Sequence, residues 1–203
     1  DEMYASHRTS RDYICNMFGI ATWGMVFPVL TVVITQLTNA ELAGMFSLAF
    51  ITATLLMMIG NYGVRTYQVS DIDERHSFAD YEVNRFITCA LMMVVGVGYC
   101  MVRGYGGDML TISIGVYFYR MIDALADVYE GRLQQQDKFY LAGISQAVRS
   151  VLVVLFFSLA LLITRNVGVA SIVMAVVAAL TFIFLTFPLG LIETPKSPRC
   201  TFE

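Results

Sequence analysis

A row of ionisable side chains lies in the segment 117–135, YFYRMIDALADVYEGRLQQ, between long apolar stretches. At about 100° per residue, five polar side chains of this segment share an arc of roughly 80° on one side of a helix. They are Arg120, Asp123, Asp127, Glu130 and Gln134. A charge inside a bilayer costs at least about 2.5–3.5 kcal/mol, so such side chains usually face a bundle interior or water. We therefore expect this helix to form one wall of a polar, water-filled cavity.

The charges of this helix do not balance. Arg120 and Asp123 are three residues apart and can pair on one helix face. Asp127 and Glu130 then leave an excess of negative charge, which needs water, a proton, a cation or another basic helix. The alternative to a hydrated transport cavity is a structural ladder of salt bridges. On the cavity interpretation, Asp123, Asp127 and Glu130 are candidates for proton or cation coupling.

A second arginine, Arg65, follows the second apolar stretch, in the sequence GNYGVRTYQ. Its planar donors suit a pair of phosphate oxygens, although an arginine at a helix end also serves as an ordinary interfacial anchor. Tyr62 and Tyr119 offer hydroxyl groups and flat faces of the kind used against sugars, or they are packing residues. The expected substrate-binding residues are therefore Arg65, Arg120, Tyr62 and Tyr119.

An enzyme is the less favoured reading of these residues. Asp123 and Asp127 lie one helical turn apart and could hold Mg²⁺ against a diphosphate. Intramembrane prenyltransferases need a second aspartate-rich pair, which is absent, and DVYEGR does not have the spacing of lipid head-group phosphotransferases. The four cysteines and two histidines are scattered without ligand spacing, so we expect free thiols, no metal site and no cofactor.

The composition places the helix in a membrane protein. The chain of 203 residues is 57% hydrophobic and 14% charged, against about 25% charged residues in an average soluble domain. This length allows about six spans of ~20 residues, so the expected fold class is an all-α integral membrane protein. The expected spans are 13–36, 41–66, 86–102, 109–133, 146–164 and 167–192.

The segments outside the spans are expected to be polar, and the tail, with its two prolines, to be irregular. We expect a cytoplasmic amino-terminal segment over 1–12, with a helix cap at Thr9 and Ser10, and a cytoplasmic tail over 193–203. The mixed charges of 70–84 predict a solvated surface loop. Pro28, inside the first span, predicts a kink.

The basic residues predict the orientation. Ten of the basic residues lie at the termini, in the second and fourth connections, or near the helix ends that flank those connections. In a chain of six spans, all these positions are on one side of the membrane. Only Arg103 and Arg165 lie on the opposite side. The ten are Arg8, Arg11, Arg65, Arg75, Arg85, Arg132, Lys138, Arg149, Lys196 and Arg199. By the positive-inside rule, both termini are cytoplasmic in a multi-pass protein of the cell membrane. The net charge of −3 gives no indication of a nucleic-acid partner.

Three stretches resemble the polysaccharide-repeat-unit flippases of the multidrug/oligosaccharidyl-lipid/polysaccharide (MOP) exporter superfamily. They are LTNAELAGMFSLAFITATLLMMIGNYGVRTYQVSD, SFADYEVNRFITC and YRMIDALADVYEGRLQQQDKFYLAG, and the similarity to the amino-terminal lobe runs over residues 10–192. The resemblance implies a lobe of six transmembrane helices that helps to flip a lipid-diphosphate-linked oligosaccharide by alternating access, for surface polysaccharide export. It also implies that Arg65 and Arg120 bind the diphosphate.

The chain departs from this family by lacking a second six-helix lobe. We expect a fragment of a longer chain or, alternatively, two copies that assemble, with membrane lipids and the lipid-linked oligosaccharide as further partners. Two other functions stay open: a drug/cation antiporter of the same superfamily, favoured by the carboxylates, and a non-transporting membrane interaction subunit, favoured by the short length.

Overall fold

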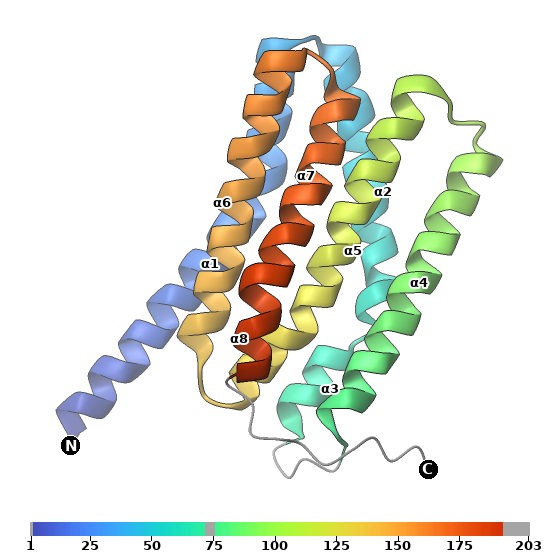
Figure 1. Ribbon diagram of the computed structural model, residues 1–203. Coiled ribbons are helices and arrows are strands. Elements are labelled where there is room, and N and C mark those ends of the chain that lie inside the picture. The colour runs from blue at the N-terminus through green and yellow to red at the C-terminus, as the bar shows by residue number, and fades with distance from the viewer. Residues whose placement is uncertain (1, 72–75, 193–203) are drawn as a thin grey trace.

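The computed structural model describes residues 2–71 and 76–192, with side chains from Ser10 onward, and the described residues form helices and short turns. Six helices or helix stacks are long and apolar enough to cross a membrane, which confirms the expected all-α membrane fold class. The elements in chain order are α1 (Glu2–Leu37), α2 (Ala40–Asn61), α3 (Val64–Ser70), α4 (Phe78–Val102), α5 (Gly107–Gln135), α6 (Phe139–Thr164), α7 (Val167–Thr181), the π-helix η1 (Phe182–Thr186) and α8 (Phe187–Ile192). Figure 1 shows that α1 begins and α8 ends at the end of the bundle where α3 also lies, and that the start of α1 leans away from the other helices.

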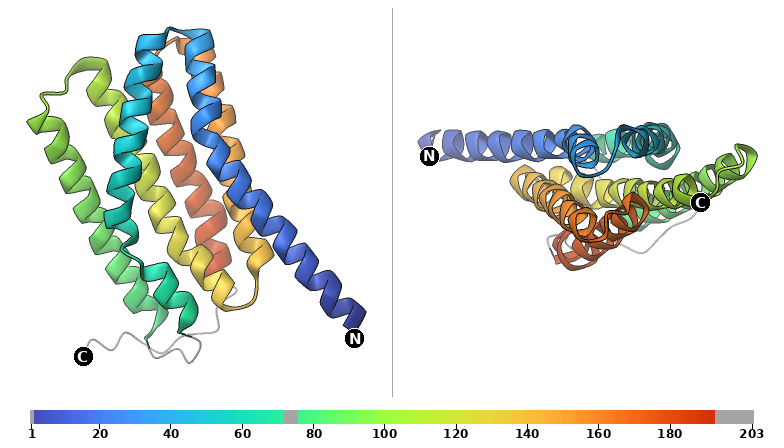
Figure 2. Two further views of the ribbon diagram at one scale, coloured as in Figure 1. Left: turned by 180° about the vertical axis from the view of Figure 1, so that it is seen from behind. Right: turned by 90° about the horizontal axis from the view of Figure 1, so that it is seen from above.

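The helix α5 lies at the centre of the bundle. It contacts α2, α3, α4, α6 and α7, and Figure 2 shows α1 and α2 in one layer with α4, α5 and α6 behind them. Its most apolar window is 61% buried, more than that of any other candidate span, although its mean hydropathy of 1.3 is the lowest of the six. The least apolar span is therefore the one most shielded from lipid, as expected for a helix that carries charges.

Close helix contacts depend on glycines at two crossings. A methyl group on Gly19 of α1 would lie 2.5 Å from the carbonyl oxygen of Gly143 in α6. A methyl group on Gly115 of α5 would lie 2.7 Å from the backbone of Ser171 in α7. Small residues allow this approach, and van der Waals packing then stabilises the helix pairs in lipid.

Side-chain caps fix the starts of three spans. The Asn39 side chain accepts a hydrogen bond of 2.8 Å from the Leu42 amide at the start of α2, and Asn166 does the same for α7. Ser77 and Asp80 form a capping box at the start of α4. This box marks the start of α4 at Phe78, so the expected loop over 70–84 is wrong for 78–84, which is helical.

Several other expected boundaries change. The second span ends at Asn61, because Tyr62 and Gly63 adopt left-handed conformations with φ of 37° and 66° and separate α2 from α3. The fifth span begins at Phe139 rather than at 146. The expected cap at Thr9 and Ser10 is wrong, because α1 is already helical there. The expected tail over 193–203 lies outside the described residues.

The helix α1 continues through Pro28. Figure 2 shows it bending near its middle, so that its amino-terminal half leans away from α2. Proline removes one backbone hydrogen bond, which makes it a common cause of such a bend. Tyr13, Ile14 and Phe18, in the leaning half, are each more than 60% exposed.

Candidate functional site

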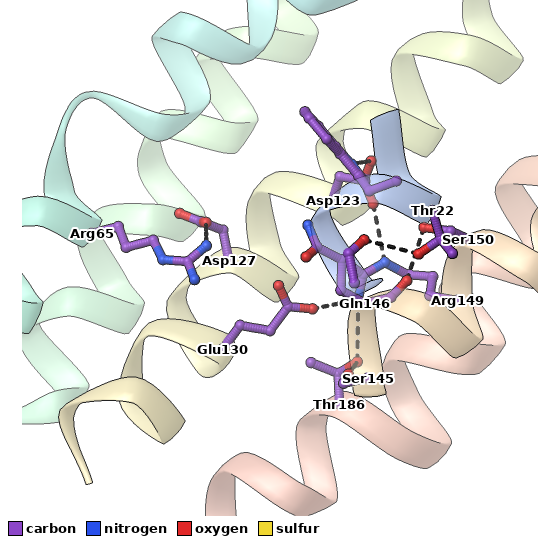
Figure 3. A network of polar contacts seen from close by, with 12 residues as sticks. Thr22, Arg65, Asp123, Asp127, Glu130, Ser145, Gln146, Arg149, Ser150 and Thr186 are labelled. Atoms are coloured by element: carbon purple, nitrogen blue, oxygen red, sulfur yellow. Dashed lines mark hydrogen bonds and ion pairs between the residues drawn. The ribbon is translucent and has the colours of Figure 1, made fainter. Parts of the chain in front are cut away.

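The acidic side chains of α5 contact arginines from three other helices as well as Arg120 of α5 itself. Five salt bridges join four arginines and three carboxylates, and Figure 3 shows part of this network. The bridges divide into two groups that share no residue. We call Arg120, Asp123, Glu130 and Arg149 the inner cluster, and Arg65, Arg85 and Asp127 the outer cluster.

Asp123 is the acceptor at the centre of the inner cluster. Its Oδ1 accepts a hydrogen bond of 3.0 Å from Arg149 Nε. Its Oδ2 accepts from Trp23 Nε1 at 3.0 Å and from Arg120 Nη1 at 3.4 Å. The helices α1, α5 and α6 therefore meet at one carboxylate, which is only 3% exposed.

Arg149 joins this carboxylate to a second one. Its Nη1 donates to Glu130 Oε1 at 2.9 Å and to Thr186 Oγ1 at 3.4 Å. Thr186 lies in the π-helix and also shares a hydrogen bond of 2.8 Å with Ser145. Figure 3 shows Arg149 between these acceptors. The inner cluster contains two arginines and two carboxylates, all at most 6% exposed, so it is neutral and enclosed.

The outer cluster has two arginines around one carboxylate. Arg65 Nη1, from α3, lies 2.5 Å from Asp127 Oδ1, and Arg85 Nη2, from α4, lies 3.0 Å from Asp127 Oδ2. Arg65 Nε also donates to Gln134 Oε1 at 3.2 Å. Among the described residues, the outer cluster therefore has one positive charge in excess. The Arg65 side chain is 32% exposed, whereas that of Arg85 is 1% exposed.

The four expected substrate-binding residues lie in two different environments. Tyr119 is 1% exposed and Arg120 is 6% exposed. The Arg120 guanidinium lies 4.4 Å from the centre of the Phe50 ring, where a cation–π interaction stabilises it. Tyr62 is 77% exposed, and with Arg65 it lies at the α3 end of the bundle. The structure therefore does not bring the four residues together in one open cavity.

Tyr62 borders a groove of about 340 Å³ between α3 and the start of α4. Tyrosine rings and polar side chains line most of it, which is a surface suited to sugars or to other polar head groups. The lining residues are Tyr62, Gly63, Val64, Tyr67, His76, Asp80, Tyr81 and Asn84.

The expected water-filled wall is wrong at Asp123 and Glu130 of α5. Asp123 and Glu130 do not face water in this structure, because Arg149 takes up their charge. The sequence left water, a proton, a cation or another basic helix as partners for the excess negative charge of α5. In the structure, basic side chains on other helices compensate it. Asp127 is the more open acid, with 14% of its side chain exposed.

Arg85 and Arg149, which the sequence places near the membrane surface, lie inside the bundle, and Trp23 is not among the expected site residues. The signal for Arg149 was the length of its helix. Once α6 begins at Phe139, Arg149 lies almost three turns inside a 26-residue span, where it needs an acidic partner. The signal for Arg85 was the Ser77 capping box, which places it two turns inside α4.

Metal ligands do not gather among the side chains described, those of residues 10–71 and 76–192: no group of three or more histidine, cysteine, aspartate or glutamate side chains is placed to hold an ion. Cys15, Cys89 and Cys100 are free thiols. The embedded charges form ion pairs with one another.

The fold defines the class of the protein as a multi-pass α-helical membrane protein with a charged central helix. Comparison of the sequence with protein-family models, with curated proteins and with solved structures finds no match.

Proposed function

We propose that the chain is one lobe of a transporter of the cell membrane that helps to flip a lipid-diphosphate-linked oligosaccharide by alternating access. The observation that carries the proposal is the charge of the embedded network, in which four arginines meet three carboxylates. An uncompensated charge within a membrane protein is costly. An anionic head group would provide the compensation.

Arg65 is the proposed first contact for the diphosphate. It belongs to the cluster that has the positive excess, and a third of its side chain is exposed. Its planar guanidinium can donate two parallel hydrogen bonds to phosphate oxygens. Tyr62 and its groove are the proposed contact for the sugars. Arg120 and Tyr119 would reach the substrate only after α5 separates from Phe50, so we propose that they stabilise the lobe in the present state.

The direction of transport follows from charge. A negative head group moving outward from a negative interior gains about 2.3 kcal/mol per unit charge per 100 mV. Return of the empty carrier would need an ion-coupling group among Asp123, Asp127 and Glu130. Asp127 is the best placed of the three, because it alone belongs to the more exposed cluster.

One specific observation favours a second candidate function. The inner cluster is neutral and buried, which is the arrangement that a purely structural ladder of salt bridges predicts. A non-transporting membrane interaction subunit would need nothing more. The positive excess argues against the third candidate, a drug/cation antiporter, since a cation would be repelled by the outer cluster.

The experiment is a binding assay on the purified chain in lipid nanodiscs, with a polyprenyl diphosphate and the uncharged polyprenol as ligands. We expect the diphosphate to bind at least tenfold more tightly than the polyprenol, and Arg65→Ala to remove most of that difference. Arg103→Ala is the matched control, because Arg103 is an exposed arginine at the carboxyl end of α4, the end away from α3. Equal affinity for the two lipids would support the non-transporting subunit instead.

A further inference from the structure

The two carboxylate oxygens of Asp127 are each held by a different arginine. Oδ1 faces Arg65 Nη1 at 2.5 Å and Oδ2 faces Arg85 Nη2 at 3.0 Å. Two guanidinium groups that converge on two oxygens of one anion form the arrangement that also binds a phosphate group, because both oxyanions accept charge-assisted hydrogen bonds from planar donors.

Arg85 is held rigidly in this arrangement. Its Nη1 donates to the Gly60 carbonyl at 2.8 Å and to Asn61 Oδ1 at 2.7 Å. These acceptors lie at the carboxyl end of α2, where the helix dipole favours a cation. Its buried Nε has no hydrogen-bond partner among the described residues. The side chain therefore keeps its place whether or not Asp127 remains bound, and it has donor capacity left.

Arg65 lies on a short helix that packs against α5. The helix α3 has seven residues and follows the left-handed pair Tyr62 and Gly63. Besides the bonds of Arg65, Gln68 Nε2 donates to the Val128 carbonyl of α5 at 3.2 Å. An anion that reaches the partly exposed Arg65 therefore meets the open edge of the outer cluster.

We propose that Arg65 and Arg85 form a two-arginine oxyanion site, in which the Asp127 carboxylate occupies the place of a phosphate group and is displaced by the diphosphate of the substrate. The inference rests on the proposed function and adds Arg85 as a ligand of the head group. One carboxylate leaves the cluster with a positive charge, and a diphosphate compensates it more completely. Asp127 is thus a built-in competitor, which keeps the site closed without substrate and helps to expel the head group afterwards.

A substitution in a binding site usually weakens ligand binding, whereas removing a built-in competitor should strengthen it. Asp127→Asn keeps the size of the side chain but removes the competing charge, so we expect it to bind inorganic diphosphate at least tenfold more tightly than the wild type. Arg85→Lys keeps the charge but loses the paired donors, so we expect weaker binding. Asp108→Asn is the matched control, because Asp108 is an exposed acid at the other end of α5.

The titration is calorimetric, on nanodisc-embedded protein at fixed pH and ionic strength, and a melting curve of each variant verifies the fold. Tighter binding by Asp127→Asn, lost again in the double variant Asp127→Asn/Arg65→Ala, is the expected result. If the wild type binds diphosphate through Arg65 but Asp127→Asn binds it equally or more weakly, Asp127 is not a competitor of the diphosphate. That result would refute this inference but would leave the proposed function standing. If neither the wild type nor Asp127→Asn binds inorganic diphosphate or polyprenyl diphosphate, both fail.

Discussion

Replacing Arg149 tests whether the inner cluster is as enclosed as the structure describes. Arg149→Met fills a similar volume but leaves two buried carboxylates short of a cation. Asp123 keeps its contact of 3.4 Å with Arg120, whereas Glu130 loses the only salt-bridge partner that it has among the described residues. Removing one partner of a buried ion pair costs about 3–5 kcal/mol. We expect the free energy of unfolding to fall by that amount.

The assay is unfolding by sodium dodecyl sulfate in mixed micelles, followed by tryptophan fluorescence. Trp23 is the only tryptophan of the chain, and its indole N–H donates to Asp123 at 3.0 Å, so its emission reports on this cluster directly. The double variant Arg149→Met/Glu130→Gln leaves Arg120 paired with Asp123 and restores neutrality. We therefore expect it to recover at least half of the lost stability.

Arg103→Met is the surface control for this experiment, with an expected change within about 0.5 kcal/mol. A change of the same small size in Arg149→Met would refute the reasoning. It would mean that water, rather than Arg149, compensates the two carboxylates, and the hydrated cavity expected from the sequence would then be the better description.

Two further substitutions test the packing and the caps by the same unfolding assay. Gly115→Ala places a methyl group 2.7 Å from the Ser171 backbone, and we expect a loss of about 1–3 kcal/mol from overpacking; Gly98→Ala, which meets nothing within 4 Å, should instead be neutral or stabilising by up to about 1 kcal/mol. Ser77→Ala removes half of the capping box of α4, and we expect a loss of about 0.5–2 kcal/mol. A larger loss from Gly98→Ala than from Gly115→Ala would contradict the described α5–α7 contact.

The arrangement of charge along α5 could be predicted from the sequence, because helical periodicity alone fixes which side chains share a face. The expected pairing of Arg120 with Asp123 is confirmed, at 3.4 Å. What faces that arc could not be predicted, since it depends on how α4 and α6 pack against α5. The two arginines that α4 and α6 contribute, Arg85 and Arg149, lie in helices that begin about two turns earlier than the apolar pattern indicates.

For the two glycines of GNYG, Gly60 and Gly63, the role of one could be predicted from the sequence and the role of the other could not. Close spacing of small residues predicts close helix packing, and this is right for Gly60, where a methyl group would lie 3.1 Å from Met92 and 3.3 Å from Ala124. Gly63 has another role, because its positive φ lets the chain leave α2 and begin α3. A glycine needed for packing and a glycine needed for a left-handed turn look alike in one sequence, so the break between α2 and α3 was not foreseen.

Photolabelling gives the most direct test of the proposed head-group site. A polyprenyl diphosphate with a diazirine next to the diphosphate would be bound to the nanodisc-embedded chain, irradiated, and its attachment points mapped by peptide mass spectrometry. We expect labels on α3 and on the carboxyl-terminal half of α5, near Arg65 and Asp127, that disappear when unlabelled diphosphate lipid is added in excess. Labels spread over the lipid-facing sides of the helices, and unchanged by the competitor, would contradict the account.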